Sequence, residues 1–408
     1  MRVLIACSLL MMILSQGLVI AQDSPEATET VEPSITLTIW WPDTFARVDD
    51  ASINPILIEQ ADAFAAQFPN VAFEHRLKAV AQPGGIMSTL RSATNAARGA
   101  LPTLTLVRRQ DLLLAQSNGY LQSLEGFPSS IQGDLNNALT LGQVEDELYG
   151  IPYLLDFQHV VYRPIADVNY DEWTYDAVLE RGETIVFPAG RINSLNDVLA
   201  LQYMESGGMP VFSNQLTFSQ EGLQALFDYY QTSVDNEILT ASILNYTSPS
   251  NYLIDFINGD INAAIFSSTR YLALIDDNPD LAIAPIPTET GAVTSFLNGW
   301  MWVMVTADER EQALALDYLN WLFNIERQAL AADAVDMLPS RERAMPNALG
   351  NVADSNFYLE MIENSSLPIA DSEIGVLGRE IQIQFASILT LEQSADDALQ
   401  TVINAVGE

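Results

Sequence analysis

The sequence predicts an α/β fold built on parallel sheets, and two observations lead to this prediction. Segments that alternate apolar and polar residues, typical of strands, take turns with segments whose apolar residues recur every three or four positions, typical of helices. This strand–helix order occurs near the N-terminus and again after residue 180. A helix between two strands makes the strands parallel and covers the sheet faces. With 408 residues, 49% of them hydrophobic, the chain can form two domains with sizeable cores.

The first strand–helix series begins at residue 35. Residues 35–40 (ITLTIW) alternate strictly and predict a strand. Pro55 suits the first position of a helix. The apolar face of that helix consists of Leu57, Ala61, Phe64 and Phe68. A strand over 71–77, a helix over 86–97 and a strand over 104–107 complete the series.

The second series is less regular. Residues 184–187 and 263–266 predict strands, and a helix is expected to follow Ser219. The apolar face of this helix consists of Leu223, Leu226, Phe227 and Tyr230. Residues 282–287 form a strand-like segment that contains two prolines. Because proline cannot donate to a ladder, we expect a stiff crossover there rather than a central strand.

The last quarter of the chain predicts helices. Thr306 and Glu309 have the spacing of a capping box that opens a helix to about Asn324. Three more helices are expected, over 357–363, 375–390 and 395–406.

The N-terminus has the layout of a secretory signal peptide. A basic residue, Arg2, precedes an almost wholly apolar run, and small or aliphatic residues end it, so we expect a signal over 1–21 that is cleaved near Ala21. Residues 22–34 (QDSPEATETVEPS) predict a flexible acidic linker. The alternatives are an uncleaved membrane anchor, since the run approaches the length of a bilayer span, and lipidation at Cys7.

Charge and cysteine content exclude several classes of protein. The chain has 17 basic against 53 acidic residues and a formal charge of −36. Such a surface repels nucleic acid and anionic lipid, so neither is expected as a partner. Cys7 is the only cysteine. Without the signal peptide the chain has no thiol, which excludes disulfides, thiol catalysis and cysteine–metal sites.

Motifs for catalysis are missing from the sequence. It contains no glycine-rich phosphate loop, no Gly-x-Ser-x-Gly and no His-Glu-x-x-His. The two histidines, His75 and His159, lie on different segments, so no histidine-rich metal site is expected. His75 shares the parity of the apolar residues in its strand, and we expect it to be buried and hydrogen-bonded. We predict no enzyme, no cofactor and no metal. A secreted glycan-active enzyme with paired carboxylates and a surface-tethered adhesion or sensor protein remain as alternatives.

Aromatic and polar residues end two of the predicted strands. Trp40, Trp41 and Asp43 close the first strand, and Arg109 and Asp111 follow the third. In parallel sheets, ligands bind beyond the carboxyl ends of the strands. A tryptophan ring suits the C–H face of a sugar, and a carboxylate accepts hydrogen bonds from its hydroxyls. Alternation places one of the two tryptophans in the core. For Arg109 and Asp111, a solvated loop before a helix is an equal alternative to a binding site.

Nine segments, in this order, resemble one family: LTIWWPD, AAQFPNVAFEH, AARGALPTLTLV, SNGYLQSLEGF, ELYGIPYLLDFQHVVYR, YMESGG, INGDINAAIFSS, APIPTETGAVTSFLNGWMWVMV and MLPSRERAM. They are similar to the family 1 extracellular solute-binding proteins of bacterial ABC importers, which are maltose-binding-protein-like. The resemblance covers nearly the whole mature chain. Thr103 departs from it, because the family commonly has Asp after the proline.

The resemblance implies a two-lobe periplasmic-binding-protein fold of type II with a hinge between the lobes. Lobe one would comprise 35–155 and 286–325, and lobe two 157–284 and 326–408. Crossovers are expected near 153–157, near 285–287 and after Asn324. The implied function is to bind a small ligand by closure of the lobes and to deliver it to an ABC permease. We expect a mono- or oligosaccharide ligand and a monomer. A polyamine or an organic anion is the alternative, since this fold serves many solutes.

The resemblance also implies ligand-binding positions. Those expected at the hinge or in the cleft are Asp156, Gln158, Asn196, Asp197, Arg270, Tyr271 and Trp300. His159 is a further candidate beside Gln158. Trp300 would be a second stacking platform, and Arg270 would favour an acidic sugar or another anionic solute. Arg341 is expected to be structural.

Overall fold

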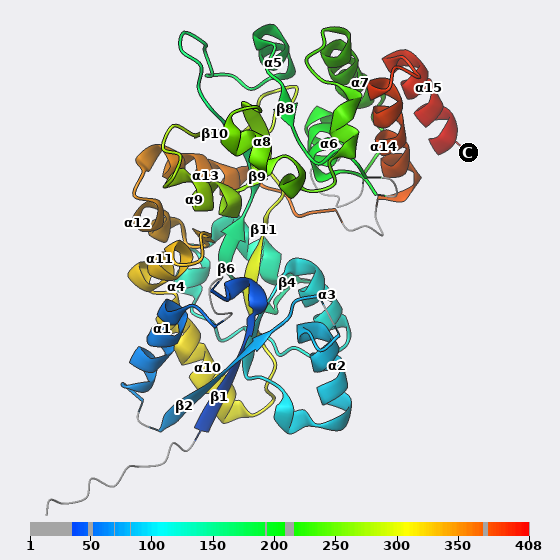
Figure 1. Ribbon diagram of the computed structural model, residues 1–408. Coiled ribbons are helices and arrows are strands. Elements are labelled where there is room, and N and C mark those ends of the chain that lie inside the picture. The colour runs from blue at the N-terminus through cyan, green and yellow to red at the C-terminus, as the bar shows by residue number, and fades with distance from the viewer. Residues whose placement is uncertain are drawn as a thin grey trace, which may run out of the picture. The chain divides into compact units, whose positions relative to one another are not determined.

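The described residues of the protein form two main β-sheets with helices packed on them (Figure 1). The computed structural model describes residues 35–47, 52–68, 70–81, 83–191, 194–208, 216–369 and 374–407. The predicted signal peptide, its cleavage near Ala21, Cys7 and the linker lie outside these residues. Both sheets belong to one compact unit. We call the six-stranded sheet with its helices the first lobe, and the four-stranded sheet with its helices the second lobe.

The sheet of the first lobe has the strand order β12-β6-β11-β3-β1-β2. Its strands are β1 Ile35–Pro42, β2 Val71–Lys78, β3 Leu104–Val107, β6 Gly150–Asp156, β11 Asn298–Met304 and β12 Leu338–Pro339. β1 runs parallel to β2 and β3, as the strand–helix alternation predicts. β11 runs antiparallel to both β3 and β6, so the sheet is mixed rather than wholly parallel. The reason is that β11 enters this sheet from the second lobe and not through a helical crossover.

The sheet of the second lobe has the order β10-β7-β9-β8. Its strands are β7 Gln158–Tyr162, β8 Ile185–Val186, β9 Ala263–Ser267 and β10 Ala282–Ala284. Only β8 and β9 pair in parallel. β10 is an edge strand that ends before Pro285, which agrees with the expectation that the prolines start a crossover. A small hairpin of β4 Gln143–Val144 and β5 Glu147–Leu148 lies apart from both sheets.

Helices cover both sheets. Those of the first lobe are α1 Pro55–Ala65, α2 Ile86–Ala96, α3 Arg109–Ser117, α4 Ser129–Gln132, α10 Glu309–Leu322, α11 Ile325–Asp333, α12 Met345–Leu349 and α13 Val352–Asn364. Those of the second lobe are α5 Tyr175–Arg181, α6 Asp197–Tyr203, α7 Gln220–Asp235, α8 Leu253–Asn258, α9 Ser268–Ile275, α14 Gly375–Leu389 and α15 Ala395–Val406. The predicted start at Pro55 is confirmed, with Asn54 as the N-cap, and Ser219 caps α7.

One predicted cap is wrong. The N-cap of α10 is Asp308, whose Oδ1 accepts from the backbone N–H groups of Arg310 (2.9 Å) and Glu311 (3.2 Å). Thr306 Oγ1 instead accepts from the N–H of Asp308 at 3.2 Å. Asp308 adjoins the helix and offers a carboxylate, the stronger acceptor for the first N–H groups.

The first sheet is buried on both faces. Trp41 lies in the apolar core on one face and Trp40 in the core on the other. β11 passes so close to β6 that a Cβ on Gly299 would lie 2.2 Å from the carbonyl oxygen of Leu154. A residue without a side chain is therefore required there, beside the register shift between Trp300 and Met301.

The third crossover lies later in the chain than predicted. Residues 326–364, assigned to lobe two from the sequence, pack on the first lobe: β12 pairs with β6, and Tyr358 of α13 joins its core. Of the C-terminal helices, α14 and α15 join the core of the second lobe around α7. The apolar faces of α11 and α13 pack on the first lobe. The sequence pattern shows that a helix face is apolar, but it does not show which sheet that face covers.

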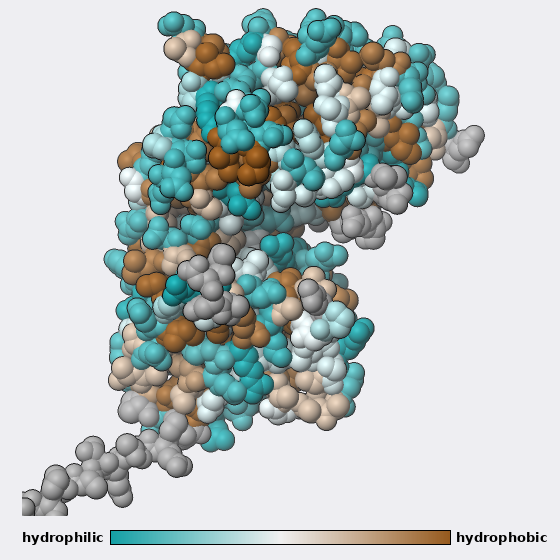
Figure 2. Space-filling view, viewed as in Figure 1, coloured by the Kyte–Doolittle hydropathy of each residue, from teal (hydrophilic) through white to brown (hydrophobic). Residues whose placement is uncertain are grey.

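The face of the molecule seen in Figure 2 is largely hydrophilic. Polar residues make up much of the face seen in Figure 2, with apolar residues between them. No helix among the described residues combines the length and apolarity needed to cross a bilayer.

Candidate functional site

A cavity of about 660 Å³ is lined by residues of both lobes. The first lobe contributes Thr44–Arg47 after β1, Asn54 at the start of α1, and Ala334–Asp336 after α11. The second lobe contributes Ser267, Thr269, Arg270 and Ala273 from the start of α9. The volume is in the range of small-molecule sites. This cavity is the candidate site, because the carboxyl end of β1 and the first turn of α9 meet there.

Asp156 lies at the hinge and ties β6 to α9. Its Oδ1 accepts hydrogen bonds from Ser268 Oγ (2.9 Å), the backbone N–H of Thr269 (3.1 Å) and Thr269 Oγ1 (3.0 Å). The carboxylate therefore satisfies the first turn of a second-lobe helix from the last residue of a first-lobe strand. Residue 157 alone separates β6 from β7, so the first crossover lies where the sequence predicts it. The structure gives Asp156 a positioning role next to the cavity.

Of the site residues predicted from the sequence, Arg270 is the one found among the described residues that line the cavity. It lies in the first turn of α9 with an exposed side chain, and its backbone N–H donates to Ser267 Oγ at 3.2 Å. Tyr271, the next residue, points elsewhere: its ring is buried, and its hydroxyl donates to Asp354 Oδ2 at 2.9 Å. Gln158 is half-buried on β7, where its carbonyl accepts from Ser295 Oγ at 2.8 Å.

The three candidate tryptophans are closed to solvent in this conformation. Trp40, Trp41 and Trp300 are 0%, 1% and 2% exposed. Only one of Trp40 and Trp41 was expected in the core. Both lie in cores, because β1 is covered on both faces. Trp41 Nε1 donates to His75 Nδ1 at 3.0 Å, so His75 is hydrogen-bonded as predicted, although only half-buried. A part for these tryptophans in ligand binding stays a prediction.

Phe45 connects Trp300 to the cavity. It lines the cavity and its ring centroid lies 5.3 Å from that of Trp300. The guanidinium of Arg108 lies 4.7 Å above the Trp300 ring, in cation–π geometry. Sequence reasoning chose Arg109 and missed Arg108, whose side chain is exposed.

The other strand-end candidates make local contacts. Arg109 donates to the carbonyls of Leu141 (2.8 Å) and Gln143 (2.5 Å), and burial lowers its pKa. Burial raises the pKa of Asp111, and the charge of Arg108 opposes this. Asp43 is exposed, and its Oδ1 accepts from the N–H of Val80 at 3.3 Å.

Asn196 and Asp197 belong to the start of α6. Asn196 is 3% exposed and caps the helix: its Oδ1 accepts from the N–H of Val198 at 2.8 Å. Asp197 faces Arg191 at 4.0 Å. The structure does not bring either residue to the cavity.

Several cavity residues escape sequence reasoning. Thr44 and Arg47 follow the first strand and carry the same signal as Asp43, so they could have been found. Asp336 could not, because it follows a C-terminal helix of the first lobe. Burial raises the pKa of Asp336, and the charges of Asp333 and Asp276 raise it further. Among the described residues, no three His, Cys, Asp or Glu side chains are grouped closely enough to hold a metal ion.

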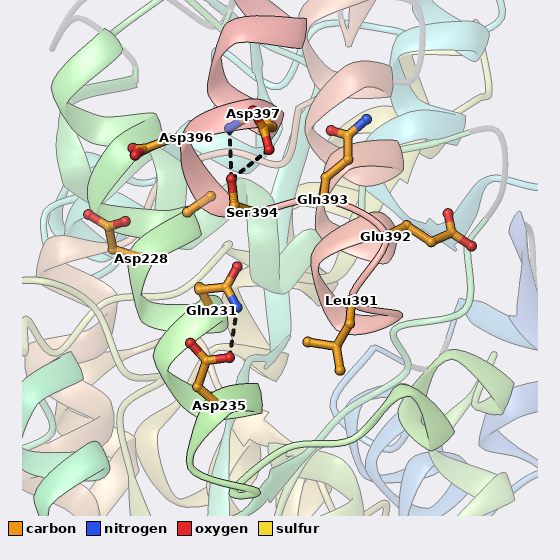
Figure 3. Close-up of a pocket in the computed structure, with 10 residues that line it drawn as sticks. Asp228, Gln231, Asp235, Leu391, Glu392, Gln393, Ser394, Asp396 and Asp397 are labelled. Atoms are coloured by element: carbon orange, nitrogen blue, oxygen red, sulfur yellow. Dashed lines mark hydrogen bonds between the residues drawn. The ribbon is translucent and has the colours of Figure 1, made fainter.

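A second hollow belongs to the second lobe alone and is acidic. Figure 3 shows Asp228 and Asp235 on α7 opposite Asp396 and Asp397 at the start of α15. Its polar groups bond to one another, as Gln231 does to Asp235 at 3.0 Å. It has no contribution from the hinge or the first lobe, and we do not assign it to ligand binding.

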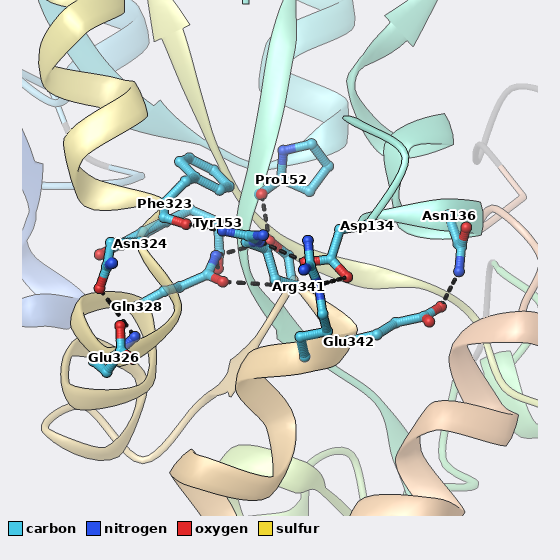
Figure 4. A network of polar contacts seen from close by, with 12 residues as sticks. Asp134, Asn136, Pro152, Tyr153, Phe323, Asn324, Glu326, Gln328, Arg341 and Glu342 are labelled. Atoms are coloured by element: carbon cyan, nitrogen blue, oxygen red, sulfur yellow. Dashed lines mark hydrogen bonds and ion pairs between the residues drawn. The ribbon is translucent and has the colours of Figure 1, made fainter. Parts of the chain in front are cut away.

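A buried polar network attaches the segment after α10 to the first lobe (Figure 4). Gln328, fully buried on α11, donates to the carbonyl of Tyr153 and to Ser340 Oγ, both at 2.9 Å. Ser340 Oγ donates to the carbonyl of Pro152 at 2.6 Å. Arg341 forms an ion pair with Asp134 at 2.6 Å and also donates to the carbonyl of Phe323. This places Arg341 in the structural role expected from the sequence, away from the cavity.

Two lobes on either side of a short hinge, with a cavity lined by both, define a two-lobe ligand-binding protein of the periplasmic-binding class. Residues 59–353 match the family model of bacterial extracellular solute-binding proteins, which is well over half of the chain. The protein belongs to this family of exported binding proteins, and the resemblance found in the sequence is confirmed.

Solved structures with the same fold agree. The cyclic α-maltosyl-1,6-maltose binding protein from Arthrobacter globiformis superposes with a TM-score of 0.69 at 16% identity, over 91% of this chain and 98% of that one. The sugar-binding protein MalE from Xanthomonas citri gives 0.67 at 15% identity, over 91% and 96%. A family 1 extracellular solute-binding protein from Bifidobacterium longum subsp. infantis gives 0.66 at 16% identity, over 92% and 99%. These likenesses show the two-lobe fold. No curated protein matches the sequence significantly.

Proposed function

We propose that this protein captures a mono- or oligosaccharide outside the cytoplasm and delivers it to the permease of an ABC importer. The cavity lined by both lobes carries the proposal, because a ligand held there contacts both sides of a hinge. The names of two proteins with the same fold, a cyclic maltosyl-maltose binding protein and a sugar-binding protein, support a carbohydrate.

The mechanism is closure of the lobes and involves no catalysis. A ligand stabilises the closed form only by binding it more tightly than the open form. Asp156 links the first turn of α9 to the end of β6, at the crossover between the lobes. Arg270, Thr269 and Thr44 then approach the ligand from α9 and from the end of β1. The permease would recognise the closed form.

Export requires the N-terminal signal. We propose that residues 1–21 direct export, that cleavage occurs near Ala21, and that the mature protein is a monomer on an acidic linker. The extracellular family supports export. N-terminal sequencing and gel filtration of the exported protein test these three statements.

A thermal unfolding scan tests the proposed function. The mature protein, residues 22–408, is heated with mono-, di- and oligosaccharides, and with polyamines and organic anions as controls. A ligand at one hundred times its dissociation constant stabilises the folded state by about 2.7 kcal/mol, which raises the midpoint by a few degrees. A shift with one class of carbohydrate is expected. A shift with a polyamine alone contradicts the proposal, and new reducing ends from an oligosaccharide would show an enzyme.

A further inference from the structure

We propose that the ligand is an acidic carbohydrate and that Arg270 binds its carboxylate. This inference rests on the proposed function and names the ligand class of the same cavity. Its starting point is a contrast of charge: acidic residues outnumber basic ones 53 to 17 in the chain, whereas the described residues that line the cavity include two arginines and one acid.

Arg270 is placed to bind an anion. Its side chain is exposed and lines the cavity. Among the described residues, no acidic side chain forms an ion pair with it. The guanidinium therefore keeps its donors for a ligand, and its planar fork suits a carboxylate in two-point contact. Arg47 lies across the cavity from α9, but it has other contacts, so the inference does not depend on it.

Two of the acids predicted to bind a sugar, Asp156 and Asp43, are not among the described residues that line the cavity. Asp156 Oδ1 accepts three hydrogen bonds from Ser268 and Thr269. Asp43 Oδ1 accepts from the N–H of Val80. Asn54 uses both ends of its amide, accepting from the N–H of Ile56 (3.1 Å) and donating to the carbonyl of Ala334 (2.7 Å).

Among the described residues that line the cavity, one is acidic, Asp336. Burial and the charges of Asp333 and Asp276 raise its pKa. Arg270 keeps its charge at all ordinary pH values, so a ligand with a carboxylate fits this part of the wall better than a polyamine.

The size of the cavity supports the same ligand. At about 660 Å³, the cavity is far larger than an inorganic anion needs. A sugar acid carries one carboxylate for Arg270 on a ring that takes up more of this volume.

Matched probes test the inference. The exported protein, with its native N-terminus, is titrated calorimetrically with galacturonate and digalacturonate, and with glucuronate as a second acid. Galactose and methyl galacturonate keep the ring and lose the charge. We expect a uronate to bind at least tenfold more tightly than its methyl ester. Arg270→Gln should weaken uronate binding ten- to a hundredfold, as expected for a charge-assisted hydrogen bond, and Arg270→Lys by less.

The control variant is Arg310→Gln. Arg310 is exposed in the first turn of α10, as Arg270 is in α9, but it lies outside the cavity. It should leave every affinity unchanged. Unfolding midpoints of both variants equal to the parent's exclude misfolding.

The outcomes separate the two proposals. Equal or tighter binding of the neutral sugars overturns the acidic ligand and leaves carbohydrate binding standing. Uronate binding that Arg270→Gln does not weaken overturns the role of Arg270. Binding of citrate or glycerol phosphate, with no carbohydrate bound, overturns both the inference and the proposed function. Absence of uronate binding while another sugar class binds also counts against the inference.

Discussion

At the scale of single residues, the burial of His159 is the most consequential feature of the hinge region. Its Nδ1 lies 3.1 Å from the carbonyl of Val160, which only accepts, so Nδ1 carries the hydrogen. Nε2 then accepts from the Tyr358 hydroxyl at 2.9 Å. The rings of Tyr271, Phe357 and Tyr358 surround it. The neutral ring thus joins β7 of the second lobe to α13 of the first.

This arrangement predicts a loss of stability in acid. Burial lowers the pKa of His159 to about 4, whereas the unfolded chain has the ordinary value of 6.5. Between these values the unfolded state binds a proton that the folded state does not. The stabilisation is therefore complete above pH 6.5 and is lost as the pH falls toward 4, by about 3 kcal/mol at most.

Urea unfolding of the parent and of His159→Gln at pH 7.5 and pH 4.5 measures this. The parent should lose more stability than the variant. The variant is needed as a reference because Asp354, near the same rings, has a raised pKa in the folded state. Asp354 therefore stabilises the folded state as the pH falls, which opposes the effect of His159. Equal losses in the two proteins would refute the prediction.

At the scale of elements, the segment from α11 to β12 is fixed to β6 by polar contacts as well as by apolar packing. Gln328 bridges the two, and its Oε1 also accepts from the N–H of Arg341 at 3.2 Å. Because all these groups are buried, leaving them unpaired has a large effect.

Gln328→Met tests this bridge. Methionine has a similar shape but cannot replace the amide, so the carbonyl of Tyr153 and the N–H of Arg341 lose a partner. We expect a loss of about 2 to 4 kcal/mol in the free energy of unfolding, from urea curves. Gln110→Met, at an exposed position of α3, should change it by less than about 0.5 kcal/mol. A similar small change at residue 328 would show that the network is dispensable.

Prediction from sequence succeeded where the pattern is local. The alternation in residues 35–40 and the spacing after Pro55 gave β1 and α1, since each follows from the geometry of its own segment. It failed where two distant segments decide. Nothing within α13 reveals that Tyr358 packs on the first lobe, and nothing in LTIWWPD reveals that both tryptophans are covered.

The candidate site shows the same division. The resemblance places Arg270 after a strand and Asp156 beside the first crossover; in the structure Arg270 lines the cavity and Asp156 lies at the hinge. Asn196, also implied by the resemblance, caps α6 and is not among the described residues that line the cavity. Asp336 and Arg270 lie far apart in the sequence and line the same cavity only in the folded protein.

At the scale of the whole molecule, the charge of −36 is the dominant property. Like charges on one compact body repel each other, and the repulsion is partly relieved on unfolding. Salt screens charges that lie farther apart than about 10 Å at 0.1 M.

Salt should therefore stabilise this protein. We expect the unfolding midpoint at neutral pH to rise by several degrees between about 0.02 and 0.5 M sodium chloride. Potassium chloride should give the same rise, since screening depends on ionic strength and not on the cation. A midpoint that falls with salt would mean that attractive ion pairs outweigh the repulsion.

The place of β11 between β6 and β3 has a consequence for how a nascent chain assembles. β1, β2, β3 and β6 emerge early, yet their sheet lacks its middle strand until residue 304 has followed. The second sheet, from β7 to β10, is continuous in the chain and can pair before that. To complete the first sheet, β11 must pair with β3 and β6 across the whole of the chain from β7 to β10. Pairing between segments so far apart in the sequence is slow. Until then the early part of the chain has no complete first sheet, so we expect the first sheet to form later than the second.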